Sequence, residues 1–152
     1  MQIEPLLKNN TKIAYRICSQ SHPVPWSLSV FEDCLTPPYF AFQLVSGESV
    51  LGYYIALLVA DEVTLMDIAV DREQRGKGIG QRLLSHCLLL AKEAGATSCW
   101  LEVRASNVSA ISLYEANGFK HIETRKGYYQ NKPNLLEEIT REDGFVMQRT
   151  SI

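Results

Sequence analysis

The chain has no surplus of positive charge. Its 152 residues include 15 Lys and Arg against 17 Asp and Glu, which gives a formal net charge of -2. Proteins that bind mainly to nucleic-acid phosphates usually carry a basic surplus. We therefore expect no direct nucleic-acid partner, although the balance still allows a local charged patch.

Cysteine is scarce, and its spacing includes no C-x-x-C pair. The four residues are Cys18, Cys34, Cys87 and Cys99. None has a histidine partner at a spacing typical of zinc sites, so we expect no metal. The sequence favours buried free thiols in a reducing compartment over disulfides. The three histidines, His22, His86 and His121, show no catalytic partner in the sequence.

Long apolar runs are also missing. The longest spans residues 50–60, interrupted by Gly52, and is too short to cross a bilayer. Residues 1–10 show no charged region followed by an apolar core, so we expect no signal peptide. Together these absences predict a cytoplasmic protein without a membrane partner. No apolar stripe is left over once a core is assigned, which favours a monomer.

Hydrophobic periodicity predicts an α/β (α+β) fold with a mixed sheet, in the order β-α-α-β-β-β-α-β-α-β-β. We expect strands at 1–7, 39–45, 50–59, 63–70, 97–103, 119–125 and 144–149, and helices at 11–20, 27–35, 80–94 and 107–117. Residues 126–143 form a long polar connection, of a length that is usually functional or mobile. Without repeats or a linker, residues 1–152 are expected to be one domain.

A glycine-rich turn joins the strand at 63–70 to the longest helix. Residues 75–80 read Arg-Gly-Lys-Gly-Ile-Gly, with Arg82 close behind. The first turn of a helix has unpaired N–H groups and a partial positive charge, so it attracts anions. Glycines let the backbone approach a phosphate closely and adopt positive φ. The segment therefore favours a diphosphate ligand.

Of three other interpretations of this turn, the sequence excludes the first and leaves the other two open. A P-loop would need Lys-Ser or Lys-Thr after its last glycine, whereas Gln81 and Arg82 follow Gly80. A dinucleotide fold would need G-x-G-x-x-G, although Glu102 lies where a ribose-binding acid would be. The third is a glycine turn that binds no ligand.

A carboxylate and a phenol follow in the next strand and helix. Glu102 alternates with Leu101 and Val103, so it faces the opposite side of the sheet near the end of a strand. Tyr114 lies about two turns into the following helix. If both reach one cleft, they form an acid–base pair. The plainer alternatives are a solvated carboxylate for Glu102 and packing against Phe119 for Tyr114.

Residues 75–80 resemble the [QR]-x-x-G-x-[GA] signature of the GNAT superfamily of N-acetyltransferases, and the element order is similar as well. The resemblance implies that acetyl-CoA is the co-substrate, that the loop binds its pyrophosphate and that the preceding strand pairs with pantetheine. The cofactor-binding residues so implied are Ile68, Ala69, Val70, Arg75, Gly76, Lys77, Gly78, Ile79, Gly80, Gln81 and Asn107.

Over nearly its full length the chain resembles the RimI-type branch of this superfamily, which acetylates the N-terminal alanine of a ribosomal protein. The similarity includes residues 25–27, 100–107, 113–115, 128–129 and 141–143. It implies Glu102 as general base, Tyr114 as general acid, and a protein or peptide N-terminus as acceptor. The segment 130–140 looks longer than its counterpart there, which puts the acceptor in question. The alternatives are a small amine or lysine acceptor, or an acyl-CoA-binding module without catalysis.

Overall fold

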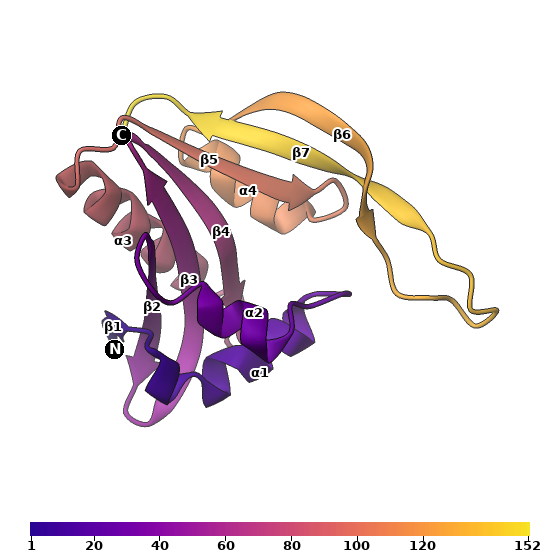
Figure 1. The fold of residues 1–152 in the computed structure, drawn as a ribbon, viewed down its shortest axis with the longest axis horizontal. Coiled ribbons are helices and arrows are strands. Elements are labelled where there is room, and N and C mark those ends of the chain that lie inside the picture. Colours follow the sequence, from indigo (N-terminus) through magenta and orange to yellow (C-terminus); the bar gives the residue numbers. More distant parts are fainter.

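The computed structural model describes residues 1–152, and one seven-stranded sheet runs through them (Figure 1). The strand order is β1-β2-β3-β4-β5-β7-β6, and only the β4–β5 pair is parallel. The bounds are β1 Gln2–Pro5, β2 Tyr39–Ser46, β3 Ser49–Val59, β4 Glu62–Val70, β5 Ser98–Arg104, β6 Lys120–Gln130 and β7 Arg141–Arg149. The expected mixed sheet and element order are therefore confirmed.

Helices cover both faces of the sheet. The α1 helix (Lys12–Ser21) and the α2 helix (Leu28–Asp33) lie on one face, and α3 (Ile79–Glu93) and α4 (Val108–Ala116) lie on the other. Two short 3-10 turns, Lys8–Asn10 and Arg72–Gln74, precede α1 and α3. No helix is long and apolar enough to cross a membrane.

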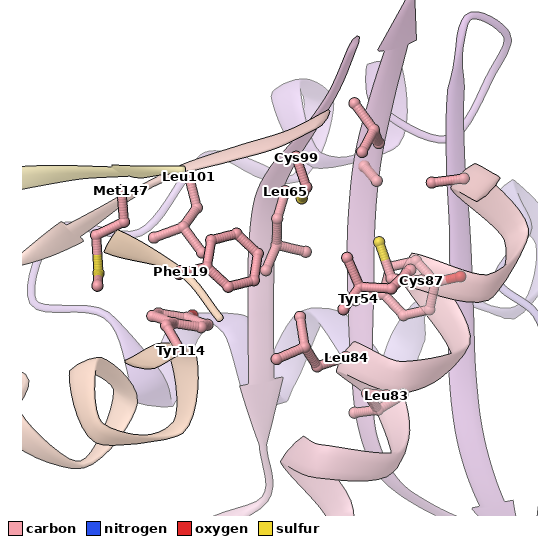
Figure 2. Packing of buried hydrophobic residues seen from close by; sticks show 14 of the residues in the cluster. Tyr54, Leu65, Leu83, Leu84, Cys87, Cys99, Leu101, Tyr114, Phe119 and Met147 are labelled. Atoms are coloured by element: carbon pink, nitrogen blue, oxygen red, sulfur yellow. The ribbon is translucent and has the colours of Figure 1, made fainter. Parts of the chain in front are cut away.

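The alternation of side chains along β3 divides the core in two. Tyr54 packs with α3 and α4, whereas Tyr53 and Ile55 pack with α1 and α2. Figure 2 shows the first cluster, in which Leu84 and Cys87 of α3 lie against the sheet and the Tyr114 ring lies near Phe119. The chain buries apolar side chains on both sides of this central strand, so the sheet is a rigid base for the cavities described below.

The parallel strands β4 and β5 separate partway along their length. Their pairing runs from Glu62 opposite Ser98 to Leu65 opposite Leu101 and stops there. Beyond this point the two strands diverge, as Figure 1 shows. A gap therefore separates residues 66–70 of β4 from residues 102–104 of β5. The smaller of the two cavities described below lies in this gap.

A β-bulge in β4 changes which way its side chains point. In the register with β3, Leu65 lies opposite Ala56 and Asp67 opposite Ile55, so Met66 has no partner. Without this extra residue, period-2 alternation would place Asp67 on the same face as Leu65, in the α3–α4 core. The bulge instead turns Asp67 toward the face covered by α1.

The long polar connection expected at 126–143 is wrong. The β6 strand continues to Gln130 and β7 already begins at Arg141, so the connection covers only residues 131–140. Most of β6 is exposed, so it lacks the apolar alternation that marks a strand in the sequence. Gly144 lets the Tyr129 ring pack closely over β7, because a Cβ at this position would lie only 2.8 Å from the ring. The hairpin extends away from the body of the protein (Figure 1).

Candidate active site

The larger of two neighbouring cavities, about 540 Å³, lies against the first turn of α3. The turn before the helix bends at Gly76 and Gly78, both with φ of +78°, and α3 begins at Ile79. These positive φ values are the left-handed conformation that glycine adopts without a steric cost. The result is a helix N-terminus whose first N–H groups have no partner within the helix and which lines the cavity, and this suits an anionic ligand.

The structure brings most of the expected cofactor residues to this cavity. Nine of the eleven line it: Ile68, Ala69, Val70, Arg75, Gly76, Gly78, Ile79, Gly80 and Asn107. Arg75 is held in place because its Nε donates to the carbonyl of Val70 at 3.3 Å. Asn107 also caps α4 by accepting from the Ala110 N–H at 3.3 Å, so it has a structural role in addition to its place in the cavity wall.

The other two expected residues, Lys77 and Gln81, lie outside the cavity lining. Lys77 donates to the Gln74 side chain at 3.1 Å. The Gln81 amide exchanges two hydrogen bonds with Asn117, at 2.9 and 2.8 Å. Gln81 thus links α3 to the end of α4, and its side chain is engaged in packing the two helices together.

The smaller cavity, about 200 Å³, lies in the gap between β4 and β5. Glu102 lines it from β5, with its side chain 33% exposed and one carboxylate oxygen 3.4 Å from the Arg125 guanidinium. Leu101 and Val103 are buried on the opposite face, which confirms the expected alternation. The Glu102 carboxylate is therefore an ionisable group that reaches the cavity and remains in contact with solvent.

Tyr114 lines both cavities and is the expected acid that joins them. Burial, followed by the negative charge of Asp67, raises the pKa of its phenol above the usual range. The phenol is therefore neutral and holds its proton at physiological pH. Its ring also packs on Phe119, with centroids 5.8 Å apart, so the packing role and a place in the cavity coexist in one side chain.

The hairpin closes one side of the smaller cavity through Tyr129, next to Arg104 of β5. The Arg104 guanidinium donates to Glu142 at 2.8 Å and to the carbonyl of Gln130 at 2.9 Å, and it stacks 4.7 Å above the Tyr129 ring. Burial and then the charge of Glu102 raise the pKa of Tyr129 to about 12. Arg104 thus fixes β5 to both strands of the hairpin.

His22, for which the sequence indicates no partner, has a carboxylate partner in the structure. Its Nε2 lies 2.8 Å from Oδ1 of Asp67, and the imidazole lines both cavities. The second oxygen of Asp67 accepts a hydrogen bond from the buried Tyr53 hydroxyl at 2.6 Å. Sequence reasoning missed this contact because the two residues are 45 positions apart and only the bulge at Met66 turns them toward each other.

A thiol belongs to the same cluster, which the cysteine spacing did not indicate. The ligand atoms of Cys18, His22 and Asp67 all lie within 4.8 Å of one another. Both oxygens of Asp67 already accept hydrogen bonds. Burial raises the pKa of the Cys18 thiol to about 11, which disfavours the thiolate that a metal would need. The cluster is therefore best described as a hydrogen-bonded network.

Comparisons with known proteins agree with this geometry. Residues 8–119 match the model of the Acetyltransferase (GNAT) family. The chain is 36% identical over 145 residues to the [ribosomal protein bS18]-alanine N-acetyltransferase of Escherichia coli K12, covering 95% of this chain and 94% of that protein.

Solved structures of acetyltransferases share this fold. The crystal structure of the ribosomal-protein-S18-alanine N-acetyltransferase from Escherichia coli superimposes with a TM-score of 0.89, over 99% of this chain and 94% of that one. A Bacillus subtilis acetyltransferase in complex with CoA, 20% identical, shares the fold with a TM-score of 0.81 over 99% of both chains.

The fold, with its split strands and its glycine turn at a helix N-terminus, is that of an acyl-CoA-dependent acyltransferase. The chain belongs to the GNAT family of acetyltransferases. It is an N-acetyltransferase, and acetyl-CoA is its co-substrate.

Proposed function

We propose that the chain transfers the acetyl group of acetyl-CoA to the N-terminal α-amine of a protein, with the N-terminal alanine of a ribosomal protein as the preferred acceptor. The observation that carries the proposal is the pair of cavities that meet at Tyr114, one beside the glycine turn and one between β4 and β5. Two substrates, one in each cavity, can react directly where the cavities join. The names of the relatives support the choice of acceptor.

The larger cavity binds acetyl-CoA in this proposal. Its pyrophosphate lies on the backbone N–H groups of residues 76–80, where the helix N-terminus and Arg75 supply positive charge. The pantetheine arm follows the edge of β4 that the split from β5 leaves unpaired, along residues 68–70, and reaches Asn107 on the other side. The thioester then lies near Tyr114, where the two cavities meet.

The acceptor amine enters the smaller cavity as an ammonium ion, since an α-amine has a pKa of about 7.7–8. Glu102 accepts a proton from it, directly or through water, which leaves a nucleophilic lone pair. The amine attacks the thioester carbonyl, and backbone N–H groups near Val70 stabilise the oxyanion. Tyr114 donates its proton to the sulfur as the C–S bond breaks. No covalent enzyme intermediate is needed.

The experiment that tests the acceptor is acetyl transfer to matched peptides. One peptide carries the first ten residues of the cognate bS18 protein, beginning with a free alanine and containing lysine. The second is identical except for a blocked N-terminus. We expect thiol release from acetyl-CoA with the first peptide only, and mass spectrometry should place a single acetyl group on the N-terminal residue.

Acetylation of both peptides on lysine would contradict the proposal and assign a side-chain acceptor. Reaction with neither peptide, while CoA still binds, would point to a small amine or to a binding module without catalysis. A third peptide that begins with a bulky residue in place of alanine measures the preference for the first residue. We expect it to react more slowly, because the cavity at the strand split is small.

A further inference from the structure

His22 is a titratable group at the junction of the two cavities to which the mechanism above gives no role. It lies directly after α1, Asp67 lies in β4 and Tyr53 lies in β3, so three elements fix one hydrogen-bonded chain. A carboxylate that holds one imidazole nitrogen also orients the ring and leaves the other nitrogen, Nδ1, available to accept a proton. Asp67 is buried and cannot turn away to solvent.

The reaction requires two proton transfers from the acceptor nitrogen, so a second base would have a role. An ammonium ion that becomes an amide loses two protons from the same nitrogen. The first leaves before the attack, and the second leaves after the new C–N bond has made the nitrogen positive. Glu102 accounts for one of them. A single carboxylate would have to release its first proton before it could accept the second.

We propose that His22, oriented by Asp67, accepts the second proton from the acceptor nitrogen, after Glu102 has taken the first. This inference rests on the proposed function. As His22 takes the proton, the carbonyl re-forms, the C–S bond breaks and Tyr114 protonates the departing thiolate. One of the two protons then returns to the tyrosinate and the other leaves to solvent. The products are the amide, CoA and one proton.

The surroundings of His22 favour a base that works near neutral pH. Burial alone would lower the pKa of the imidazole, but the hydrogen bond and the charge of Asp67 outweigh it and raise the pKa above the usual value. Arg104 and Arg75 oppose this rise. The other titratable groups around it are Cys18, Tyr53, Glu102, Tyr114 and Tyr129. His22 is the one among these groups whose usual pKa lies near 6.5.

Two variants test the role, with a matched control. His22→Gln removes the proton acceptor, and we expect kcat to fall about tenfold or more while the KM for acetyl-CoA stays within about twofold. Asp67→Asn keeps an oxygen for the Nε2–H but removes the charge. His86→Gln is the control, because His86 also hydrogen-bonds a buried tyrosine, Tyr54, at 2.9 Å but lines neither cavity. We expect it to leave kcat unchanged.

The pH profile of kcat separates catalysis from structure. Neutral His22 is the active form, so kcat rises as pH rises through the pKa of His22. Asp67→Asn lowers that pKa, and the rising limb should move to lower pH. The limb from the acceptor amine is common to all variants and does not move. If Asp67→Asn leaves the profile unchanged, or if His22→Gln raises only the KM for the peptide, His22 merely shapes the wall and the proposal is wrong.

The test distinguishes this proposal from the choice of acceptor. Wild-type turnover of the bS18 peptide measures the acceptor, whereas the ratio of variant to wild type measures His22 with any primary amine that the wild type acetylates. If His22→Gln fails to bind CoA in a titration, it is misfolded and gives no result. The presence or absence of the pH shift in Asp67→Asn then tests the role of His22.

Discussion

The two cavities are built in different ways. The larger one has one wall from a single stretch of chain, residues 68–80, in which backbone and glycine conformation matter more than side chains, and it is completed by residues 104–114 and 21–23. The smaller one is formed by side chains from the loop after α1, from β4, β5, α4 and β6. Binding of a common co-substrate thus depends on local backbone shape, whereas acid–base chemistry and the choice of acceptor depend on contacts between distant segments.

The largest effect that this contrast predicts comes from removing the proton-transfer groups of the smaller cavity. The double variant Glu102→Gln and Tyr114→Phe keeps the shape of both side chains but cannot accept or donate the required protons. Each such group typically contributes about 10²–10⁴ in rate, so we expect kcat to fall by about a thousandfold or more. Calorimetric titration should show CoA affinity within about twofold of the wild type. Undiminished turnover would remove both residues from the mechanism.

The next largest effect should be a loss of CoA affinity, caused by a change in the larger cavity alone. Gly78→Ala places an L-residue at a φ of +78°, at a cost of about 1–2 kcal/mol, which we expect the turn to relieve by changing shape. The affinity for CoA should then fall about tenfold, with kcat at saturation nearly kept.

Gly95→Ala is the matched control for that variant. Gly95 has a φ of +93° after α3, and a Cβ at either glycine meets nothing within 4 Å. Both variants should lose similar thermal stability, but only Gly78→Ala should lose CoA affinity. Equal loss of affinity in both would show that the turn has no special part in binding.

A smaller effect should follow when the hairpin is detached from β5. Arg104→Met removes the hydrogen bonds to Glu142 and Gln130, and hydrogen bonds to charged groups contribute about 1.5–3 kcal/mol each. We expect a lower urea midpoint and a several-fold higher KM for the peptide, while the KM for acetyl-CoA changes little. An equal rise in both KM values would contradict the assignment of this wall to the acceptor.

The smallest effect should come from Gln81→Ala, although the resemblance to the GNAT signature implies that this residue binds the cofactor. Its amide bonds only Ser85 and Asn117, so its loss should lower the free energy of unfolding by about 0.5–1.5 kcal/mol. CoA affinity should not change in a direct titration. A clear loss of affinity would show that the side chain turns toward the ligand after all.

The sequence was informative wherever structure depends on neighbours along the chain. The glycine turn lies within a few residues of the helix N-terminus that it precedes, and its place before the longest helix was predicted correctly. The alternation of Leu101, Glu102 and Val103 was equally reliable, because a strand with one buried face imposes it.

The sequence was less informative where a contact joins distant segments. Residues 126–143, the outer part of the hairpin of β6 and β7, were expected to be a loop because most of β6 is exposed and nothing local records its pairing. The bulge at Met66 was also hidden. One signal for it was present: strict alternation from Val63 and Leu65 would bury Asp67 in an apolar core, which a carboxylate disfavours. This conflict predicts either a bulge in the strand or a polar partner for Asp67, and the structure has both, at Met66 and His22.

The most direct test of the account is a crystal structure of the protein with CoA joined covalently to a peptide that begins with alanine. We predict that the pyrophosphate lies on the N–H groups of residues 76–80 and that the peptide nitrogen lies in the smaller cavity, within hydrogen-bonding reach of Glu102 or one bridging water and beside Tyr114. A pyrophosphate bound away from the glycine turn, or a peptide that leaves the gap between β4 and β5 empty, would contradict it.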